Sequence, residues 1–363
     1  MTSPLSGRSI SRIVRFRPIE LQNFPAGART DLSIPIYFDA MGASVDMPLI
    51  LLRGRRIRPI VGICAALHGD ELNGIKVIHR IISDLDPDKF KGSLLCAPIL
   101  NVPSYKAGTR RFPEDGKDLN NMFPGKVAGL PSEQYARAIF DTYLKSVDYL
   151  IDFHTASEGR RNTFYVRADL TSPATRDLAH LMAPEIILHG KSGDGTLRSA
   201  ARRRDIPAIT VEAGDPDVFQ PRMTRSGEWG VRNILHHLGI LSAPPEPVDL
   251  VRPPVVCHSS TWLRTRIGGL LDTRFALGEF LEKGQRVAEV LDPFGYRIGA
   301  YDAPSAGVVI GMSGSPVAVP GTRYCHLGQV GLDPIGKPPT GRVARPLDSL
   351  LQEESVDDLG EDK

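Results

Sequence analysis

The stretch VGICAALHGDELNG, residues 61–74, decides the fold that we expect for this chain. Its five apolar or small residues at 63–67 predict a buried strand, which the chain leaves at His68 and Gly69. Apolar side chains then recur at helical spacing, at Leu72, Ile75, Ile78, Ile82 and Leu85. The stretch therefore predicts a histidine and a glutamate at the carboxyl end of a strand, the edge at which open α/β sheets bind ligands.

His68 and Glu71 are three residues apart at this edge. On one turn, an imidazole and a carboxylate at this spacing can reach a single metal ion, and zinc accepts both as ligands. By itself the pair is more typical of a solvated first helical turn, where a carboxylate interacts favourably with the helix dipole. The pair alone leaves both interpretations open.

Length and charge limit the class of protein. A chain of 363 residues, 41% of them hydrophobic, can form one large domain with a smaller one beside it. Lys and Arg number 44 and Asp and Glu 42, so the net charge of +2 creates no field that would attract nucleic acid. No run approaches the roughly 18 apolar residues of a membrane-spanning helix. We expect neither nucleic acid nor a membrane as a partner.

The cysteines and the N-terminus indicate the compartment. Cys64, Cys96, Cys257 and Cys325 are far apart and form no CxxC pair, which suits reduced packing residues in a cytoplasmic protein. Residues 1–30 lack the apolar core of a secretory signal. They are rich in Ser and Arg and faintly resemble an organelle transit peptide. We interpret them as an ordinary mobile arm.

Residues 31–243 carry the pattern of an α/β domain. Residues 32–52 predict edge strands, and Pro35 favours an edge over a central position. Helical periodicity then alternates with nearly continuous apolar runs, among them GSLLCAPIL, VDYLIDFH, PEIILHG and IPAITVEAG. Such strands predict a mostly parallel or mixed sheet with helices on both faces. The long loop at residues 101–125 is rich in Gly, Pro, Asn and Asp, which favours a functional role.

Residues 244–333 have a different pattern. Short β runs separated by Gly-bearing turns predict a small all-β domain, similar to the barrel-sandwich fold of lipoyl- and biotin-type domains. Lys283 does not lie at the hairpin tip where such domains carry a cofactor, so we do not interpret it as a carrier lysine. Residues 334–363, with their prolines and acids, predict a disordered tail.

Three predicted strands end on groups that zinc can use. His68 and Glu71 follow the first strand, and His154 and Glu212 end two later ones. The carboxyl ends of parallel strands meet at one edge, so these residues can converge. Two histidines and one glutamate leave a position open for water, as in catalytic zinc sites, and Glu212 would then be the base. Asp152, on the same strand face as His154, is a candidate acceptor for its imidazole.

Four segments, in order, carry a family resemblance: HGDELNG, TRRFPEDGKDLNNMFPG, LIDFHTAS and ITVEAG. Together they resemble the succinylglutamate desuccinylase/aspartoacylase family, which is itself similar to zinc carboxypeptidases. The resemblance spans roughly Ile34 to Leu238, and the C-terminal β region is similar to that family's second domain. It implies a zinc carboxypeptidase-like α/β fold and one Zn²⁺ per chain.

The resemblance also implies roles for individual residues. The zinc ligands are His68, Glu71 and His154, and Glu212 is the glutamate that activates water. Arg110 matches the arginine that polarises the scissile carbonyl, and Asn120 matches a substrate-binding asparagine.

One position departs from the family pattern. The family usually has Asn-Arg where this chain has Asn120-Asn121. An asparagine cannot supply the charge with which the arginine would bind a substrate carboxylate, so N-acetylaspartate and succinylglutamate are doubtful substrates. Arg160 and Arg167 are candidates to replace that charge, and exposed arginines that only solvate a surface are the alternative.

We therefore expect a zinc-dependent amidohydrolase that removes the acyl group from a small N-acyl amino acid or related amine. The first alternative is a metallocarboxypeptidase, against which Asn121 counts, and the second is a non-catalytic metal- or ligand-binding protein. The partner would be a small N-acylated molecule, and a homo-oligomer is left open. The other seven histidines have no partner at ligand spacing, and we interpret them as structural or surface residues: His79, His180, His189, His236, His237, His258 and His326.

Overall fold

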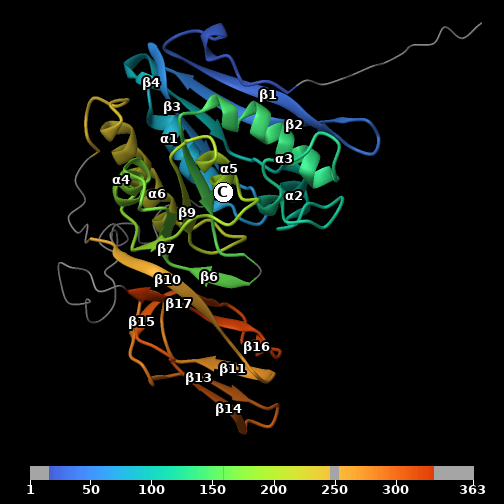
Figure 1. Ribbon diagram of the computed structural model, residues 1–363, viewed down its shortest axis with the longest axis vertical. Coiled ribbons are helices and arrows are strands. Elements are labelled where there is room, and N and C mark those ends of the chain that lie inside the picture. Colours follow the sequence, from blue (N-terminus) through green and yellow to red (C-terminus); the bar gives the residue numbers. More distant parts are fainter. Residues whose placement is uncertain (1–15, 158, 246–252, 331–363) are drawn as a thin grey trace, which may run out of the picture.

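One large sheet runs through both halves of the chain in the computed structural model, which describes residues 16–157, 159–245 and 253–330 (Figure 1). Its strands follow the order β1-β2-β4-β3-β5-β9-β7-β8-β10-β17-β15-β12, and β6 pairs with β15 off this path. A second sheet has the order β14-β13-β11-β16. The first 15 residues, assigned to the arm, and residues 334–363, assigned to the tail, lie outside the described ranges.

Two antiparallel strands begin the large sheet. β1 (Ala28–Phe38) is its edge strand and pairs with β2 (Ser44–Arg53), as the pattern at residues 32–52 predicts. The register shifts between Pro35 and Tyr37, where proline cannot donate to the ladder. The edge prediction is confirmed for β1, which contains Pro35, and is wrong for β2, which pairs with β4 on its other side.

The centre of the sheet is parallel and buried. β4 (Lys91–Ala97), β3 (Arg56–Cys64), β5 (Tyr149–His154) and β9 (Ala208–Ala213) are parallel neighbours. β7 (Phe164–Ala168) then pairs antiparallel with β9, and β8 (Ile186–His189) parallel with β7. The sheet is therefore mixed, as expected.

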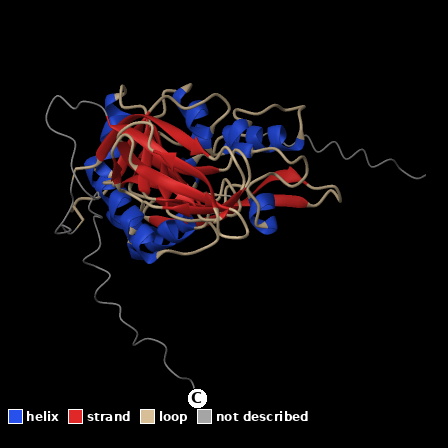
Figure 2. Ribbon diagram, turned by 90° about the horizontal axis from the view of Figure 1, so that it is seen from below, coloured by secondary structure: helices blue, strands red, loops and turns tan. Residues whose placement is uncertain are grey.

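Helices cover both faces of this sheet (Figure 2). On one face α1 (Asn73–Asp84), α4 (Pro173–Leu181) and α6 (Pro221–His237) pack into a core with the central strands. On the other face α3 (Pro131–Thr142) and α5 (Leu197–Arg202) form a second core. The sequence prediction of an α/β sheet covered on both faces is confirmed.

Local signals set several helix ends. α3, α4 and α6 each begin with a proline, whose fixed φ and missing N–H suit the first turn. The short α2 (Val102–Ala107) starts after Asn101, whose side chain caps Ser104 N.

Among the residues that the structure describes, none of the helices has the length and apolar character of a membrane span. The 3₁₀ turns are Leu21–Asn23, Pro87–Lys89, Leu119–Asn121 and Leu144–Ser146.

The strand and helix around His68 are shorter than the sequence pattern suggests. β3 ends at Cys64 and α1 begins at Asn73, so His68 and Glu71 lie in the turn between them and not on a helical turn. The backbone of 65–67 pairs instead with the loop after β4, through Leu100 N to Ala65 O and Asn101 N to Ala66 O. Together with the hydrogen bond from Ala65 N to Ala97 O, they continue the pairing of this segment with β4 and the chain that follows it.

The C-terminal half extends the large sheet. β10 (Val255–Arg264) pairs parallel with β8 and antiparallel with β17 (Arg323–Val330), and β15 (Gly307–Ser313) and β12 (Phe280–Leu281) follow. The second sheet contains β11 (Gly269–Thr273), β13 (Arg286–Leu291), β14 (Arg297–Asp302) and β16 (Val317–Ala318).

The expected all-β region is thus present but is joined to the α/β part. β6 (Arg160–Asn162) crosses over to pair with β15. Parallel pairing of β10 with β8 continues the first sheet into this region. The domain limits at residues 31, 243 and 333 stay predictions.

Candidate active site

Two histidines and one glutamate converge where the turn after β3 meets the end of β5. Glu71 Oε1 lies 2.8 Å from His68 Nδ1, and Glu71 Oε2 lies 2.8 Å from His154 Nδ1. One ligand atom from each residue lies within 4.8 Å of the others, and all three residues are buried. This group could hold a metal ion, and its members are those that the sequence indicated.

A second carboxylate orients each imidazole. His154 Nε2 lies 3.0 Å from Asp152 Oδ2, and His68 Nε2 lies 3.1 Å from Asp118 Oδ1. Each ring therefore turns its Nδ1 toward the shared centre, because its other nitrogen is already engaged. Asp152 lies where the sequence placed it. Asp118 was missed, although it stands two residues before Asn120 in the same motif.

The electrostatics of the centre favour positive charge. Burial alone would raise the pKa of Glu71, but the charges of His68 and His154 outweigh burial and lower this pKa. Burial likewise opposes protonation of His154, yet Asp152 and Glu71 hold its pKa well above the usual value. These carboxylates would stabilise a bound cation in the same way.

Arg110 reaches the same centre from the long loop after β4. Its Nη1 donates to Ser157 Oγ at 2.6 Å and lies 3.3 Å from Glu71 Oε1, and its Nη2 donates to Asp118 Oδ2 at 2.8 Å. The side chain is 25% exposed. A fixed guanidinium therefore faces the site from the side of the loop.

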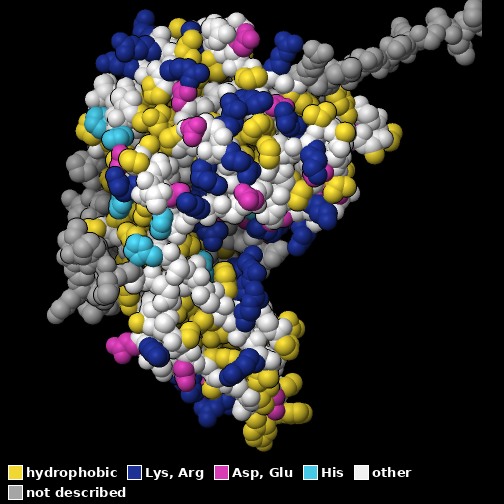
Figure 3. Space-filling view, in the orientation of Figure 1, with side chains coloured by type: hydrophobic (Ala, Val, Ile, Leu, Met, Phe, Trp, Pro, Cys, Tyr) yellow, Lys and Arg dark blue, Asp and Glu magenta, His cyan; other side chains and the backbone are white. Residues whose placement is uncertain are grey.

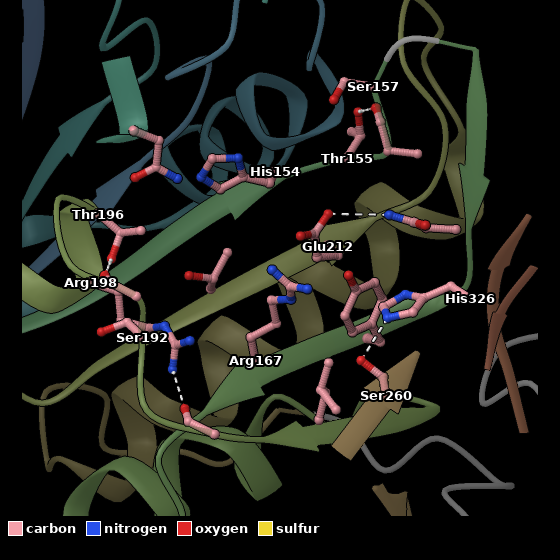
Figure 4. Close-up of a pocket in the computed structure, with 18 of the residues that line it drawn as sticks. His154, Thr155, Ser157, Arg167, Ser192, Thr196, Arg198, Glu212, Ser260 and His326 are labelled. Atoms are coloured by element: carbon pink, nitrogen blue, oxygen red, sulfur yellow. Dashed lines mark hydrogen bonds between the residues drawn. The ribbon is translucent and has the colours of Figure 1, made fainter. Parts of the chain in front are cut away.

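Glu212 lies opposite His154 on the neighbouring strand, since the two residues are register partners of β9 and β5 (Figure 4). Asn162 Nδ2 donates to Glu212 Oε2 at 3.2 Å, and the Tyr165 hydroxyl also hydrogen-bonds this carboxylate. Burial raises the pKa of Glu212, an effect that the charge of Arg167 opposes. A carboxylate with a raised pKa at a cleft is suited to proton transfer.

The three potential metal ligands, Arg110 and Glu212 line one cavity of about 480 Å³. Its far wall comes from the C-terminal half, and Figure 3 shows the molecule hollowed between the two halves, with Lys and Arg side chains along the hollow. This wall was missed at the sequence level because its residues carry no motif. Its members are Ser259, Ser260, Trp262, Arg323 and His326.

Positive side chains dominate the cavity lining. Two carboxylates, Glu71 and Glu212, line it together with six cationic side chains: Arg110, Arg160, Arg167, Lys191, Arg198 and Arg323. His189 and His326 also line it, so their interpretation as structural or surface residues was incomplete. The cavity is therefore suited to an anionic molecule.

The three predicted substrate-binding residues have different positions. Asn120 lines the cavity, and its Oδ1 accepts a hydrogen bond from Leu197 N at 3.0 Å. Arg160 also lines it and donates from Nε to Ser157 O at 2.8 Å. Asn121 is exposed and is not among the lining residues. The structure brings two of the three to the cavity, and their roles stay predictions.

Residues 58–238 match the model of the succinylglutamate desuccinylase/aspartoacylase catalytic domain. The chain belongs to the succinylglutamate desuccinylase/aspartoacylase family. The match contains the three potential metal ligands, Arg110 and Glu212. The family resemblance noted in the sequence is confirmed.

Two curated relatives of this family member have named activities. N-alpha-acetyl-L-2,4-diaminobutyric acid deacetylase of Halomonas elongata is 26% identical over 274 residues, which cover 72% of this chain and 79% of the relative. Succinylglutamate desuccinylase of Yersinia pestis is 23% identical over 255 residues, covering 64% and 76%. Both relatives are named for the removal of an acyl group.

Solved structures have the same fold. A succinylglutamate desuccinylase/aspartoacylase from Rhodobacter sphaeroides has a TM-score of 0.75 at 22% identity, covering 84% of this chain and 96% of the other. The product-bound ectoine utilization protein EutE from Ruegeria pomeroyi has a TM-score of 0.74 at 24% identity, covering 83% and 94%. At these identities the likeness concerns the fold alone.

Proposed function

We propose that this protein is a zinc-dependent deacylase that hydrolyses the amide bond of a small N-acylated amino acid. One observation carries the proposal: the group His68–Glu71–His154, the Glu212 carboxylate and the Arg110 guanidinium all face one cavity of about 480 Å³. The two relatives named as a deacetylase and a desuccinylase support this reaction type.

The donor set fits zinc. Two imidazoles and one carboxylate are a common ligand set of catalytic zinc, which keeps a further position for water or substrate. Both Nδ1 atoms face Glu71, and both Nε2 atoms are engaged by Asp118 and Asp152. A zinc ion bound there would lower the pKa of water and polarise the scissile carbonyl.

Two protein side chains would then have separate roles, one in proton transfer and one in stabilising the negative charge. Glu212 accepts the proton of the attacking water and passes it to the nitrogen of the departing amine. Arg110 donates to the carbonyl oxygen, where negative charge develops, a contribution of about 3 kcal/mol for a well-placed donor. Ser157 and Asp118 hold the guanidinium in this position.

The charges of the cavity indicate a substrate with a carboxylate. Six cationic side chains line it against two carboxylates that have roles in the chemistry. The charge that Asn121 lacks is therefore available from other elements, with Arg198 from α5 and Arg167 from β7 among them. An acidic N-acyl amino acid becomes a reasonable substrate, contrary to what the Asn120-Asn121 motif suggested.

Substrate turnover distinguishes this proposal from its alternatives. The zinc-loaded protein is incubated with a pool of N-acyl amino acids and, separately, with dipeptides that have a free carboxylate, and products are followed by mass spectrometry. We expect release of the acyl group from at least one N-acyl amino acid. Glu212→Gln should lower kcat by about a thousandfold or more and keep its zinc, because it removes only the base.

Two results would contradict the proposal. Hydrolysis of the dipeptides with inert N-acyl amino acids would indicate a carboxypeptidase. Equal inertness of the zinc-loaded protein and its Glu212→Gln variant would indicate a binding protein.

A further inference from the structure

Asn162 is a buried residue that directly contacts the proposed base. Its side chain is 6% exposed, and its Nδ2 donates to Glu212 Oε2 at 3.2 Å (Figure 4). A carboxylate can only accept, so the NH₂ end of the amide must face it. This contact engages one oxygen of Glu212, whose side chain lines the cavity.

The position of Asn162 depends on the C-terminal half. Asn162 is the last residue of β6, and Gly311 of β15 is its register partner. Immediately after it, Thr163 donates from both its backbone N and its Oγ1 to Ile310 O, each at 3.0 Å. On the other side, Asn162 N donates to Asp215 Oδ1 at 3.3 Å. A strand from one half thus fixes a side chain that acts in the other.

Gly311 provides the space in which the Asn162 amide lies. A Cβ added at Gly311 would stand 2.5 Å from Asn162 Oδ1, closer than real side chains approach. Gly311 does not have a positive φ, so its backbone would accept an alanine. Close approach, and not conformation, is the reason for glycine at this position.

We infer that Asn162 is a positioning residue for Glu212, held in place by the β6–β15 pairing and by the missing side chain of Gly311. This inference rests on the proposed deacylase function. Asn162 fixes one carboxylate oxygen so that the other points toward the cavity and its water. The C-terminal half is then part of the catalytic arrangement, because it holds a residue that orients the base.

Substitution of Asn162 tests the positioning role. Asn162→Ala should lower kcat by about ten- to a hundredfold, the effect of losing a hydrogen bond to a charged group, with KM within about threefold. Asn162→Asp, which has nearly the same shape, should lower kcat at least as much, since it sets a second carboxylate against Glu212. Both variants should keep their zinc content and their Tm within a few degrees.

Gly311→Ala tests the positioning role indirectly, because its Cβ would displace the Asn162 amide. It should lower kcat in the wild-type background but cause no further loss in the Asn162→Ala background, where no amide remains to be displaced. A crystal structure of Gly311→Ala should show Asn162 Nδ2 beyond hydrogen-bonding distance of Glu212. Gly299→Ala, on β14 of the second sheet, is the matched control, because its Cβ would meet only the flexible side chain of Ile267 so closely. Its kcat should be unchanged.

The outcomes separate the inference from the function on which it rests. An active wild type whose Asn162 variants keep kcat within about twofold would overturn the inference and leave the deacylase intact. Equal losses from Gly311→Ala in both backgrounds would also overturn it, since Gly311 would then act independently of Asn162. A wild type that is inert on the whole N-acyl panel would overturn the proposed function and the inference together.

Discussion

Glu71 is the residue that links the two histidines of the site. Its two oxygens contact the two imidazoles at 2.8 Å each, and Thr155 N also donates to Oε2 at 3.2 Å. Such a carboxylate cannot turn toward solvent without breaking all three contacts. The donor atoms of the proposed zinc site are therefore held in place by the protein itself.

At this scale, Asp152 should control metal affinity without binding the metal. Asp152→Asn keeps the size of the side chain but loses the charge that orients His154, and it should weaken zinc binding by about ten- to a hundredfold. Competition with a chelator of known affinity measures this change. Asp141→Asn on α3 is the control. Equal affinity in wild type and Asp152→Asn would show that Asp152 has no such role.

Substitutions of Arg198 and Asn121 should have very different effects on KM. Burial, followed by the charge of Arg167, lowers the pKa of Arg198 to about 10, so Arg198 stays charged at neutral pH. Arg198→Ala should raise KM for an acidic N-acyl substrate by about tenfold or more, because a charged hydrogen bond is lost. Asn121→Ala should change KM by less than about twofold, since its side chain is exposed outside the cavity lining. Steady-state kinetics would refute this if the two effects were reversed.

At the scale of elements, β17 brings His326 into the cavity wall. The ring stacks on Trp262 with centroids 4.7 Å apart. Its Nε2 lies 2.7 Å from Ser260 Oγ (Figure 4). Burial, followed by the charges of Arg167, Arg160 and Arg323, lowers the pKa of His326 to about 3. The folded protein therefore keeps this histidine neutral over a range in which an unfolded chain would protonate it.

This difference in protonation makes the folded protein less stable as the pH falls. An unfolded histidine titrates near pH 6.5, so below that pH the unfolded chain binds a proton that the folded chain does not. The free energy of unfolding should fall by about 2 kcal/mol between pH 7 and pH 5 from this residue alone. His326→Gln should remove this part of the fall, as measured by chemical denaturation at both pH values. His237→Gln, at an exposed position, should not.

The elements also show what the sequence could predict. The strands that end on His154 and Glu212 were predictable because each is an apolar run followed by a polar group. The strands β6 and β7 were not predictable. Their segment, GRRNTFYVRAD, contains several charged residues, and its two strands pair with strands that are distant in the sequence. Asp118 and the residues of the C-terminal cavity wall were also missed, because only the folded chain brings them to the site.

At the scale of the whole molecule, the continuous sheet joins the two halves. β10 pairs with β8, and β15 pairs with β6 next to the proposed base. Arg160 lies over Trp262 of β10, with its guanidinium carbon 5.7 Å from the ring centroid. The cavity therefore depends on both halves, although the matched catalytic domain covers only residues 58–238.

A chain cut after residue 243 should consequently fail as an enzyme. It loses the partners of β8 and β6 and exposes a buried sheet edge, which favours aggregation. We expect lower solubility and kcat/KM at least about a hundredfold below that of the full chain, by size-exclusion chromatography and kinetics. A soluble, monodisperse fragment with full activity would show that the C-terminal half is dispensable.

The zinc content of the purified protein and two variants tests the proposed metal site most directly. Mass spectrometry of the metal should give one zinc per chain for the wild type and for Glu212→Gln, and nearly none for His154→Ala. A wild type that binds no zinc after incubation with the metal, or a His154→Ala variant that keeps it, would contradict the site.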